Sequence, residues 1–138
     1  FKYRSLKMKK NFSNAWKASS QKRKQRKFVF NAPLHVKHKF VNVSLSKELK
    51  AEHSTRAVPV RVGDVVEIMA GQFKSTSGKV SKVSLIKTKV YVEGAAVKRR
   101  DGTDSLYPIH PSNLRITSLD LSDKTRADKL AKVKEANK

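Results

Sequence analysis

The stretch that decides the fold is residues 60–74, which read VRVGDVVEIMAGQFK and are followed by GKV at residues 78–80. From residue 58 onward, apolar side chains alternate with other residues, which is the period-two pattern of a strand with one buried face. Gly63-Asp64 predicts a turn, residues 65–69 predict the next strand, and residues 70–72 predict the loop that ends it. This part of the chain is therefore expected to form two short strands joined by a tight turn.

The same pattern continues to residue 121. Valines between residues 80 and 92 predict a pair of strands, and Asp101-Gly102 predicts a tight hairpin turn. The apolar residues of 114–119 predict a last strand. Short strands at spacings of about 8–12 residues, separated by glycine turns, are typical of a small antiparallel barrel, so the expected fold class is mainly β. Four glycines are expected to be structural turn residues: Gly63, Gly71, Gly78 and Gly102.

The charge of the chain is strongly unbalanced. Its 138 residues include 32 Lys or Arg and 11 Asp or Glu, which gives a formal net charge of +21. Residues 1–27 hold eleven of the basic residues and no acidic one. This distribution predicts a cationic arm on a compact body, with a polyanion as the partner. Because residues 1–30 have few apolar side chains to bury, we expect them to be extended and without persistent structure in the free protein.

Two short helices and a tail complete the predicted organisation. Pro33, followed by apolar residues three or four apart, predicts a helix over about 33–41. Leu45 and Leu49 predict a second helix over 45–53, capped by Ser44 or Ser46. The expected division is a basic arm at 1–30 that binds the polyanion, a short helical segment at 31–57, a barrel at 58–121 and a charged C-terminal helix or tail at 122–138.

Several segments of the chain together resemble a known family. Residues 60–74 with 78–80 look like a KOW motif, and the flanking segments are RKF at 26–28, NAPLH at 31–35, LSKEL at 45–49 and YPIHPSN at 107–113. In this order, over about residues 21–121, they resemble the universal large-subunit ribosomal protein L24 family. The resemblance is to its archaeal and eukaryotic branch, which is called L26 in eukaryotes.

The resemblance implies an SH3-like KOW barrel bound to large-subunit ribosomal RNA, near the 5′ domain of that RNA and the mouth of the polypeptide exit tunnel. It implies a cytoplasmic, ribosomal location beside neighbouring large-subunit ribosomal proteins, and a function in scaffolding the folding and assembly of the RNA. It implies no cofactor, no small-molecule substrate and no enzymatic activity. Where the family usually has Lys-Gly, this chain has Lys74-Ser75, which puts a turn with positive φ at that point in question. Residues 1–20 have no counterpart in the expected family arm.

The candidate RNA-binding residues are basic side chains of the arm, the helical segment and the barrel. Those of the arm are the best candidates, because an extended cationic segment can enter grooves of folded RNA where phosphates crowd. Arg can bind a phosphate through two parallel hydrogen bonds, whereas Lys acts as a point charge. Phe73 has two open interpretations, since its ring could cover the end of the barrel or stack on a base. The full set of candidates is Lys22, Arg23, Lys24, Arg26, Lys27, His35, Lys37, His38, Lys39, Lys47, Arg61, Lys74, Lys79, Lys82, Arg99, Arg100 and His110.

The composition argues against several other kinds of site. The chain has no Cys, which excludes disulfides, Cys-ligated metals and thiol catalysis. Its four His come with no nucleophile–base–acid set and no Walker-type phosphate loop, so neither a catalytic nor a metal site is expected. No run of 18 apolar residues exists, so no membrane span is expected. Two other functions stay open as alternatives: a KOW-type transcription elongation factor and an SH3- or Tudor-like peptide-binding module.

Overall fold

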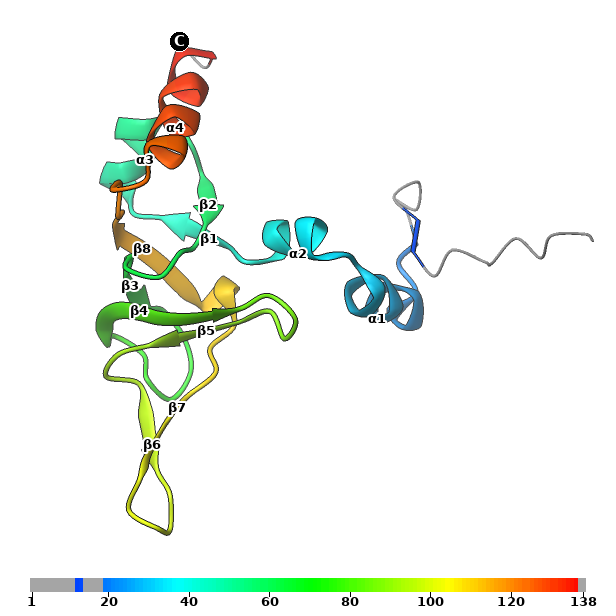
Figure 1. Ribbon diagram of the computed structural model, residues 1–138, viewed down its shortest axis with the longest axis vertical. Helices are drawn as coiled ribbons and strands as arrows, with labels where there is room; N and C mark the ends of the chain where they lie inside the picture. Colours follow the sequence, from blue (N-terminus) through cyan, green and yellow to red (C-terminus); the bar gives the residue numbers. More distant parts are fainter. Residues whose placement is uncertain (1–11, 14–18, 137–138) are drawn as a thin grey trace, which may run out of the picture.

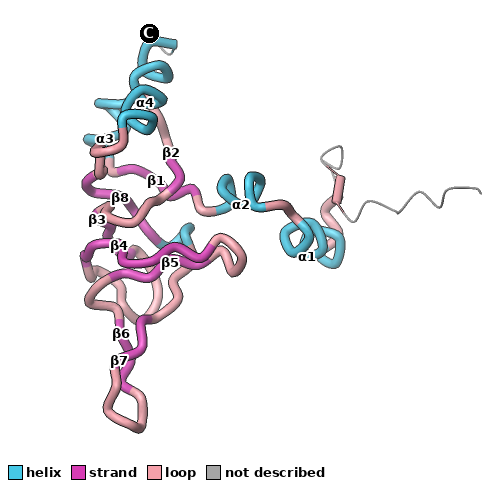
Figure 2. The backbone as a smooth tube through the Cα atoms, viewed as in Figure 1, coloured by secondary structure: helices cyan, strands magenta, loops and turns pink. Residues whose placement is uncertain are grey.

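The computed structural model describes residues 12–13 and 19–136 (Figure 1). Strands make up the body, and helices lie at both ends of the described chain (Figure 2). The expected mainly β class with a C-terminal helix is therefore confirmed. Most of the predicted arm, residues 1–11 and 14–18, lies outside the described residues. The elements are α1 (Lys22–Asn31), α2 (Leu34–Phe40), β1 (Asn42–Leu45), α3 (Lys47–His53), β2 (Ala57–Pro59), β3 (Val65–Ile68), β4 (Ser77–Ser84), β5 (Lys89–Val92), β6 (Ala96–Lys98), β7 (Asp104–Leu106), the 3-10 helix η1 (Pro111–Asn113), β8 (Leu114–Ser118) and α4 (Lys124–Ala136).

The strands form an open mixed sheet rather than the closed antiparallel barrel that the sequence predicts. Six strands lie in the order β2-β1-β8-β3-β4-β5, and β6 pairs with β7 as a separate hairpin. All described pairs are antiparallel except β1 with β8, where Leu45 lies opposite Ile116 in parallel register. No strand was predicted at β1, because Leu45 was assigned to the helix predicted over 45–53. That helix begins only at Lys47, and Leu45 lies in β1. This parallel strand extends the sheet beyond β8.

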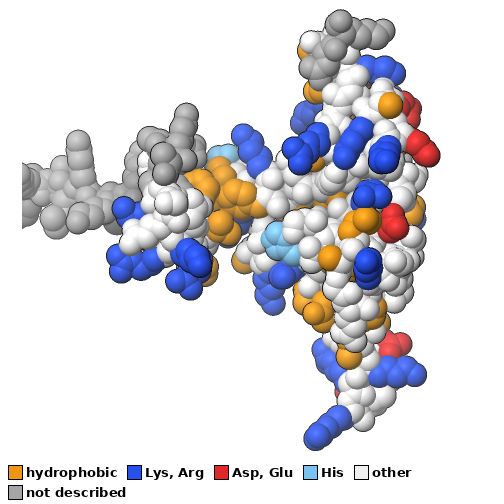
Figure 3. All heavy atoms as spheres, turned by 180° about the vertical axis from the view of Figure 1, so that it is seen from behind, with side chains coloured by type: hydrophobic (Ala, Val, Ile, Leu, Met, Phe, Trp, Pro, Cys, Tyr) orange, Lys and Arg blue, Asp and Glu red, His pale blue; other side chains and the backbone are white. Residues whose placement is uncertain are grey.

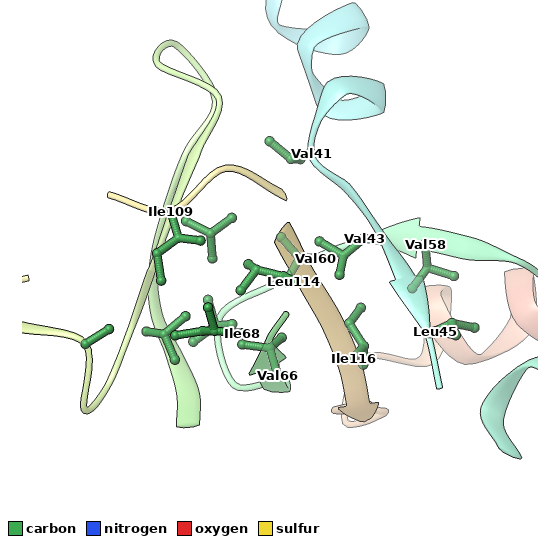
Figure 4. Packing of buried hydrophobic residues seen from close by; sticks show 14 of the residues in the cluster. Val41, Val43, Leu45, Val58, Val60, Val66, Ile68, Ile109, Leu114 and Ile116 are labelled. Carbon is green, nitrogen blue, oxygen red and sulfur yellow. The ribbon is translucent and has the colours of Figure 1, made fainter. Parts of the chain in front are cut away.

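Most of the core consists of alternate residues from the sheet strands, and Leu130 of α4 also belongs to it. Val43, Leu45, Val66, Val90 and Ile116 are fully buried, and their neighbours along each strand face outward. Figure 4 shows side chains of β1, β2, β3 and β8 meeting between the strands. Each buried Val, Leu or Ile contributes about 1.5–3 kcal/mol relative to an exposed position, so this cluster is the main stabilising contact of a small fold.

The short helices follow local capping signals. α3 begins after Ser46, whose hydroxyl accepts a hydrogen bond from the Leu49 N–H at 3.3 Å. Of the two predicted caps, Ser46 is therefore confirmed, while Ser44 lies within β1. The helix predicted over 33–41 is α2, which begins after Pro33.

The prediction of an extended arm over 1–30 is wrong for residues 22–30, which lie in the helix α1 (Lys22–Asn31). Lys, Arg and Gln have high helix propensity, and this segment consists largely of them. The C-terminal end of α1 also has tertiary partners. The ring of Phe28 lies 6.1 Å from that of Phe40 on α2, measured between centroids. Side-chain propensity and this aromatic contact together favour a helix over an extended chain.

Three of the four predicted turn glycines adopt the conformation that a turn requires. Gly63, Gly71 and Gly102 have φ between 80° and 100°. Gly78 differs, because it lies within β4 opposite Val66, so its assignment to a turn is wrong. It instead approaches a neighbouring backbone closely: a Cβ at this position would lie 2.2 Å from the carbonyl oxygen of Glu93.

A buried ion pair joins the C-terminal helix to the sheet. Oδ1 of Asp64 accepts from Nη1 of Arg126 at 2.6 Å and from the Asp120 N–H at 3.0 Å. Oδ2 accepts from Nη2 of Arg126 at 2.7 Å and from the Arg61 N–H at 2.8 Å. Arg126 is 6% exposed and also donates to the carbonyls of Pro59 and Asp120. Asp64 thereby holds two loops and α4 at a single point.

An exposed ion pair lies at the start of α4. Arg61 pairs with the Asp123 carboxylate, which also accepts hydrogen bonds from the hydroxyl and, at 3.0 Å, from the N–H of Thr125. The Thr125 hydroxyl, followed by the Arg61 guanidinium, lowers the pKa of Asp123 to about 2. Asp123 is therefore ionised at neutral pH, where its negative charge favours the positive N-terminal end of α4.

Replacing Gly78 by Ala is expected to destabilise the protein by about 1–3 kcal/mol, because the added methyl group pushes β4 away from the Glu93 carbonyl. The control is Gly102→Ala, because a Cβ at residue 102 would meet no atom within 4 Å. Only the left-handed backbone conformation is unfavourable there, and it should lower the free energy of unfolding by about 1 kcal/mol. Thermal or urea unfolding of the two variants measures the difference. A Gly78→Ala variant as stable as the wild type would contradict the close approach.

Arg126→Met is expected to destabilise the protein by about 3–5 kcal/mol, since it leaves the Asp64 carboxylate buried without its cation. Arg61→Met makes the same chemical change at the half-exposed pair with Asp123 and should cost less than about 1 kcal/mol. Urea unfolding compares the two variants. Equal losses would show that the buried pair does not hold α4 in the way described.

Candidate nucleic-acid interface

Helix α1 carries the densest group of exposed cations in the described chain. Figure 1 shows it projecting away from the sheet, connected through α2. None of its residues is buried, and its first turn contains no acidic residue. Figure 3 shows blue side chains gathered over this projection. The exposed cations are the predicted residues Lys22, Arg23, Lys24, Arg26 and Lys27.

The charges of α1 oppose its own helix. Cations at the N-terminal end face the positive end of the helix dipole. Lys22 with Arg26, and Arg23 with Lys27, are like-charge pairs four residues apart, which destabilise an isolated helix. A bound polyanion would remove both penalties. The exposed side of α1 therefore presents positive charge that no acidic residue of the same helix offsets.

Lys37 has a structural role in place of the predicted RNA contact. It is 7% exposed, and its Nζ donates to the carbonyl oxygen of Phe30 at 3.2 Å. That carbonyl lies in the last turn of α1, where a cation stabilises the negative end of the helix dipole. Lys37 therefore fixes α1 on α2, and we leave it out of the interface. The other predicted residues of this region, His35, His38, Lys39 and Lys47, are exposed.

The loop between β3 and β4 presents Lys74 to solvent. The Lys74 N–H donates to the carbonyl of Gly71 at 3.2 Å, and the Ser75 N–H donates to that of Ile68 at 2.8 Å. Ser75 has φ of 67°, so this chain keeps a left-handed turn where the family usually has glycine. The loop is therefore closed by its own hydrogen bonds despite the substitution.

Two lysines of β4 lie on one outer face of the sheet. The register of β4 and β5 shifts between Val80 and Lys82, which marks a β-bulge. A regular strand would place Lys79 and Lys82 on opposite faces, but the extra residue returns Lys82 to the side of Lys79. Both lysines are exposed.

The hairpin β6–β7 presents Arg99 and Arg100 at its tip. Figure 1 shows the hairpin projecting from one end of the sheet. Nη2 of Arg99 donates to the Ser105 hydroxyl at 3.3 Å. The Thr103 hydroxyl and N–H donate to Asp101 and lower the pKa of its carboxyl group. Asp101 thereby closes the turn that holds the two arginines.

Two further candidates have structural partners. His110 precedes η1, and its Nδ1 accepts from the Ser112 N–H at 3.3 Å, so it caps this short helix. Arg61 is paired with Asp123. Both side chains remain partly accessible, so they can also contact a ligand.

Comparison with known protein families identifies the family of this chain. A family model described as ribosomal proteins L26 (eukaryotic) and L24p (archaeal) matches residues 19–133. The chain belongs to this family. It is accordingly a large-subunit ribosomal protein, a structural component of the ribonucleoprotein in translation. The match confirms the resemblance inferred from the sequence and extends it into α4.

Sequence reasoning missed two features of this ribosomal protein. One is the ion pair of Asp64 and Arg126, because Asp64 was taken only as a turn residue. The other is the contact between Phe73 and Tyr107, whose ring centroids lie 5.3 Å apart. The ion pair can be predicted only from the tertiary fold, because its two residues lie far apart in sequence. The aromatic contact had one sequence signal, which is an aromatic residue beside a lysine in the KOW loop.

Neither a metal-binding cluster nor a membrane-spanning helix is seen in the described part of the ribosomal protein. Within residues 12–13 and 19–136, no group of three or more His, Cys, Asp or Glu side chains is placed to hold a metal ion. Within the same residues, no helix combines the length and apolar character needed to cross a bilayer.

Proposed function

We propose that this protein binds large-subunit ribosomal RNA through α1 and scaffolds the folding and assembly of that RNA near the polypeptide exit tunnel, in the cytoplasm and beside neighbouring ribosomal proteins. The observation that carries the proposal is α1: five exposed cations on a helix without an acidic residue, anchored by Phe28 and Lys37. Membership of the L26 and L24p family supports the large-subunit location.

The proposed mechanism is neutralisation of crowded phosphates. Each cation that pairs with a phosphate releases a condensed counterion, which makes binding favourable and dependent on salt. Arg23 and Arg26 can bind phosphates with two parallel hydrogen bonds, and the lysines act as point charges. Because α1 projects beyond the body, it can reach RNA helices that the sheet does not touch. Neutralising these phosphates lets RNA segments pack together around it.

The body is proposed to supply a second set of contacts. The loop, the outer face of β4 and the hairpin tip each place cations outside the sheet, and α2 and α3 add further exposed basic side chains. The proposal includes the division of the chain into an arm at 1–30, a helical segment at 31–57, a body at 58–121 and a tail at 122–138. The proposed secondary contacts are His35, His38, Lys39, Lys47, Arg61, Lys74, Lys79, Lys82, Arg99, Arg100 and His110.

Replacing Lys22, Lys24, Arg26 and Lys27 by Gln is expected to flatten the salt dependence of RNA binding. Each phosphate contact contributes about 0.7–0.9 to the slope of log affinity against log salt, so the loss should be about three. The measurement is a titration of the full chain with a transcript of the 5′ domain of large-subunit RNA at several salt concentrations.

The matched control removes four cations from α4: Lys124, Lys129, Lys132 and Lys134, each replaced by Gln. These side chains are exposed, but α4 also carries Asp128 and Glu135. We expect this variant to change the slope by less than one. Equal flattening by both variants would mean that net charge alone drives binding, and would contradict a specific role for α1.

A further inference from the structure

A small hollow lies where the loop after β3 meets the segment that follows β7. Its volume is about 150 Å³, and its lining includes Gly71, Phe73, Lys89, Tyr107, His110 and Asn113. These residues come from the β3–β4 loop, β5, the segment after β7 and η1. The fold therefore brings distant parts of the sequence together around one concave surface.

Two aromatic rings form part of the hollow. The centroids of Phe73 and Tyr107 lie 5.3 Å apart, with an angle of 53° between the ring planes. Phe73 is half-buried and packs against the hydrophobic core, which holds it in place. Tyr107 keeps 41% of its surface exposed, and its N–H donates to the Ala95 carbonyl at 2.8 Å. One ring thus supports another that remains accessible.

The backbone keeps the hollow open. Gly71 has φ of 100°, and a Cβ there would meet no atom within 4 Å. The Met69 N–H donates to the Asn113 carbonyl at 2.7 Å, which ties the loop after β3 to η1. Hydrogen bonds of Lys74 and Ser75 close the same loop. The shape is therefore fixed by the backbone before any ligand arrives.

The polar lining favours an electronegative ligand. Lys89 and His110 can donate hydrogen bonds, and the side-chain amide of Asn113 can both donate and accept. No carboxylate belongs to the lining among the described residues. This composition disfavours a cationic group, such as a lysine side chain of a peptide.

We infer that this hollow binds one unstacked RNA base, which stacks on Tyr107 and is hydrogen-bonded by Asn113 or His110, while Lys89 pairs with the adjoining phosphate. Single-stranded RNA is commonly recognised in this way, through an aromatic platform and polar contacts to the base edge. The inference rests on the proposed RNA binding and adds to it a contact that reads a base rather than phosphates.

The first test uses fluorescence. Trp16 is the single tryptophan of the chain, so the double variant Trp16→Phe, Tyr107→Trp reports from the hollow alone. A base stacked on the new indole is expected to quench its emission when the 5′-domain transcript saturates the protein. The control, Trp16→Phe with Val133→Trp, places the reporter on α4 at a residue of similar exposure, 40%. Equal emission changes at both positions would overturn the inference.

The second test uses affinity and salt dependence together. Tyr107→Leu should weaken binding of the transcript by about fivefold to a hundredfold, since a base loses its stacking partner. The slope against salt should stay unchanged, because no phosphate contact is removed. Tyr107→Phe keeps the ring and should bind like the wild type. A loss of affinity without a change of slope would indicate that Tyr107 contributes by stacking and not through a charged contact.

The results separate this inference from the proposed function. A thermal transition first shows that the Tyr107→Leu variant is folded. If this variant then binds the transcript as well as the wild-type chain does, the inference is overturned and the proposed role of α1 stands. This would also be the result if the hollow held a segment of a neighbouring protein. If the wild-type chain does not bind the transcript, the proposed function and this inference both fail.

Discussion

The buried carboxylate of Asp64 is the point on which the arrangement of the body depends. It accepts hydrogen bonds from the turn before β3, from the segment after β8 and from Arg126 on α4. Two charges removed from water are stable only while they remain paired, so these three segments must meet at one place. Arg126 of α4 also donates to the carbonyl of Pro59 at the end of the edge strand β2. The hydrophobic cluster supplies the stability, and the ion pair sets where the C-terminal helix lies.

Several acidic residues outside α1 are engaged in local contacts. Asp101, Asp120 and Asp123 all accept local hydrogen bonds, and the pKa of each is lowered by them, first by Thr103, Ser122 and Thr125 respectively. They remain ionised at neutral pH and are engaged in turns and in the start of α4. The cations of α1 have no acidic neighbour on their own helix. The fold thus separates structural charge pairs in the body from exposed cations that a polyanion can neutralise.

Local patterns made part of this structure predictable. Period-two valines located β3, β4 and β5, and Ser46 marked the start of α3, because these features depend on nearby residues. The parallel pairing of β1 with β8 and the contact of Asp64 with Arg126 join residues far apart in sequence, so only the packed fold specifies them. In the site, exposed cations followed from composition. The contact of Lys37 with the last turn of α1 could not be predicted in this way. The charge of a lysine is the same whether it caps a helix or contacts a phosphate.

The most direct measurement of the central claim is an electron cryomicroscopy map of the large ribosomal subunit containing this protein. The account predicts that residues 22–31 are helical there, with phosphate oxygens about 2.7–2.9 Å from at least three of the five cationic side chains of α1, the distance of a charge-assisted hydrogen bond. A map in which α1 faces solvent or packs only against protein, with no phosphate near these side chains, would contradict it.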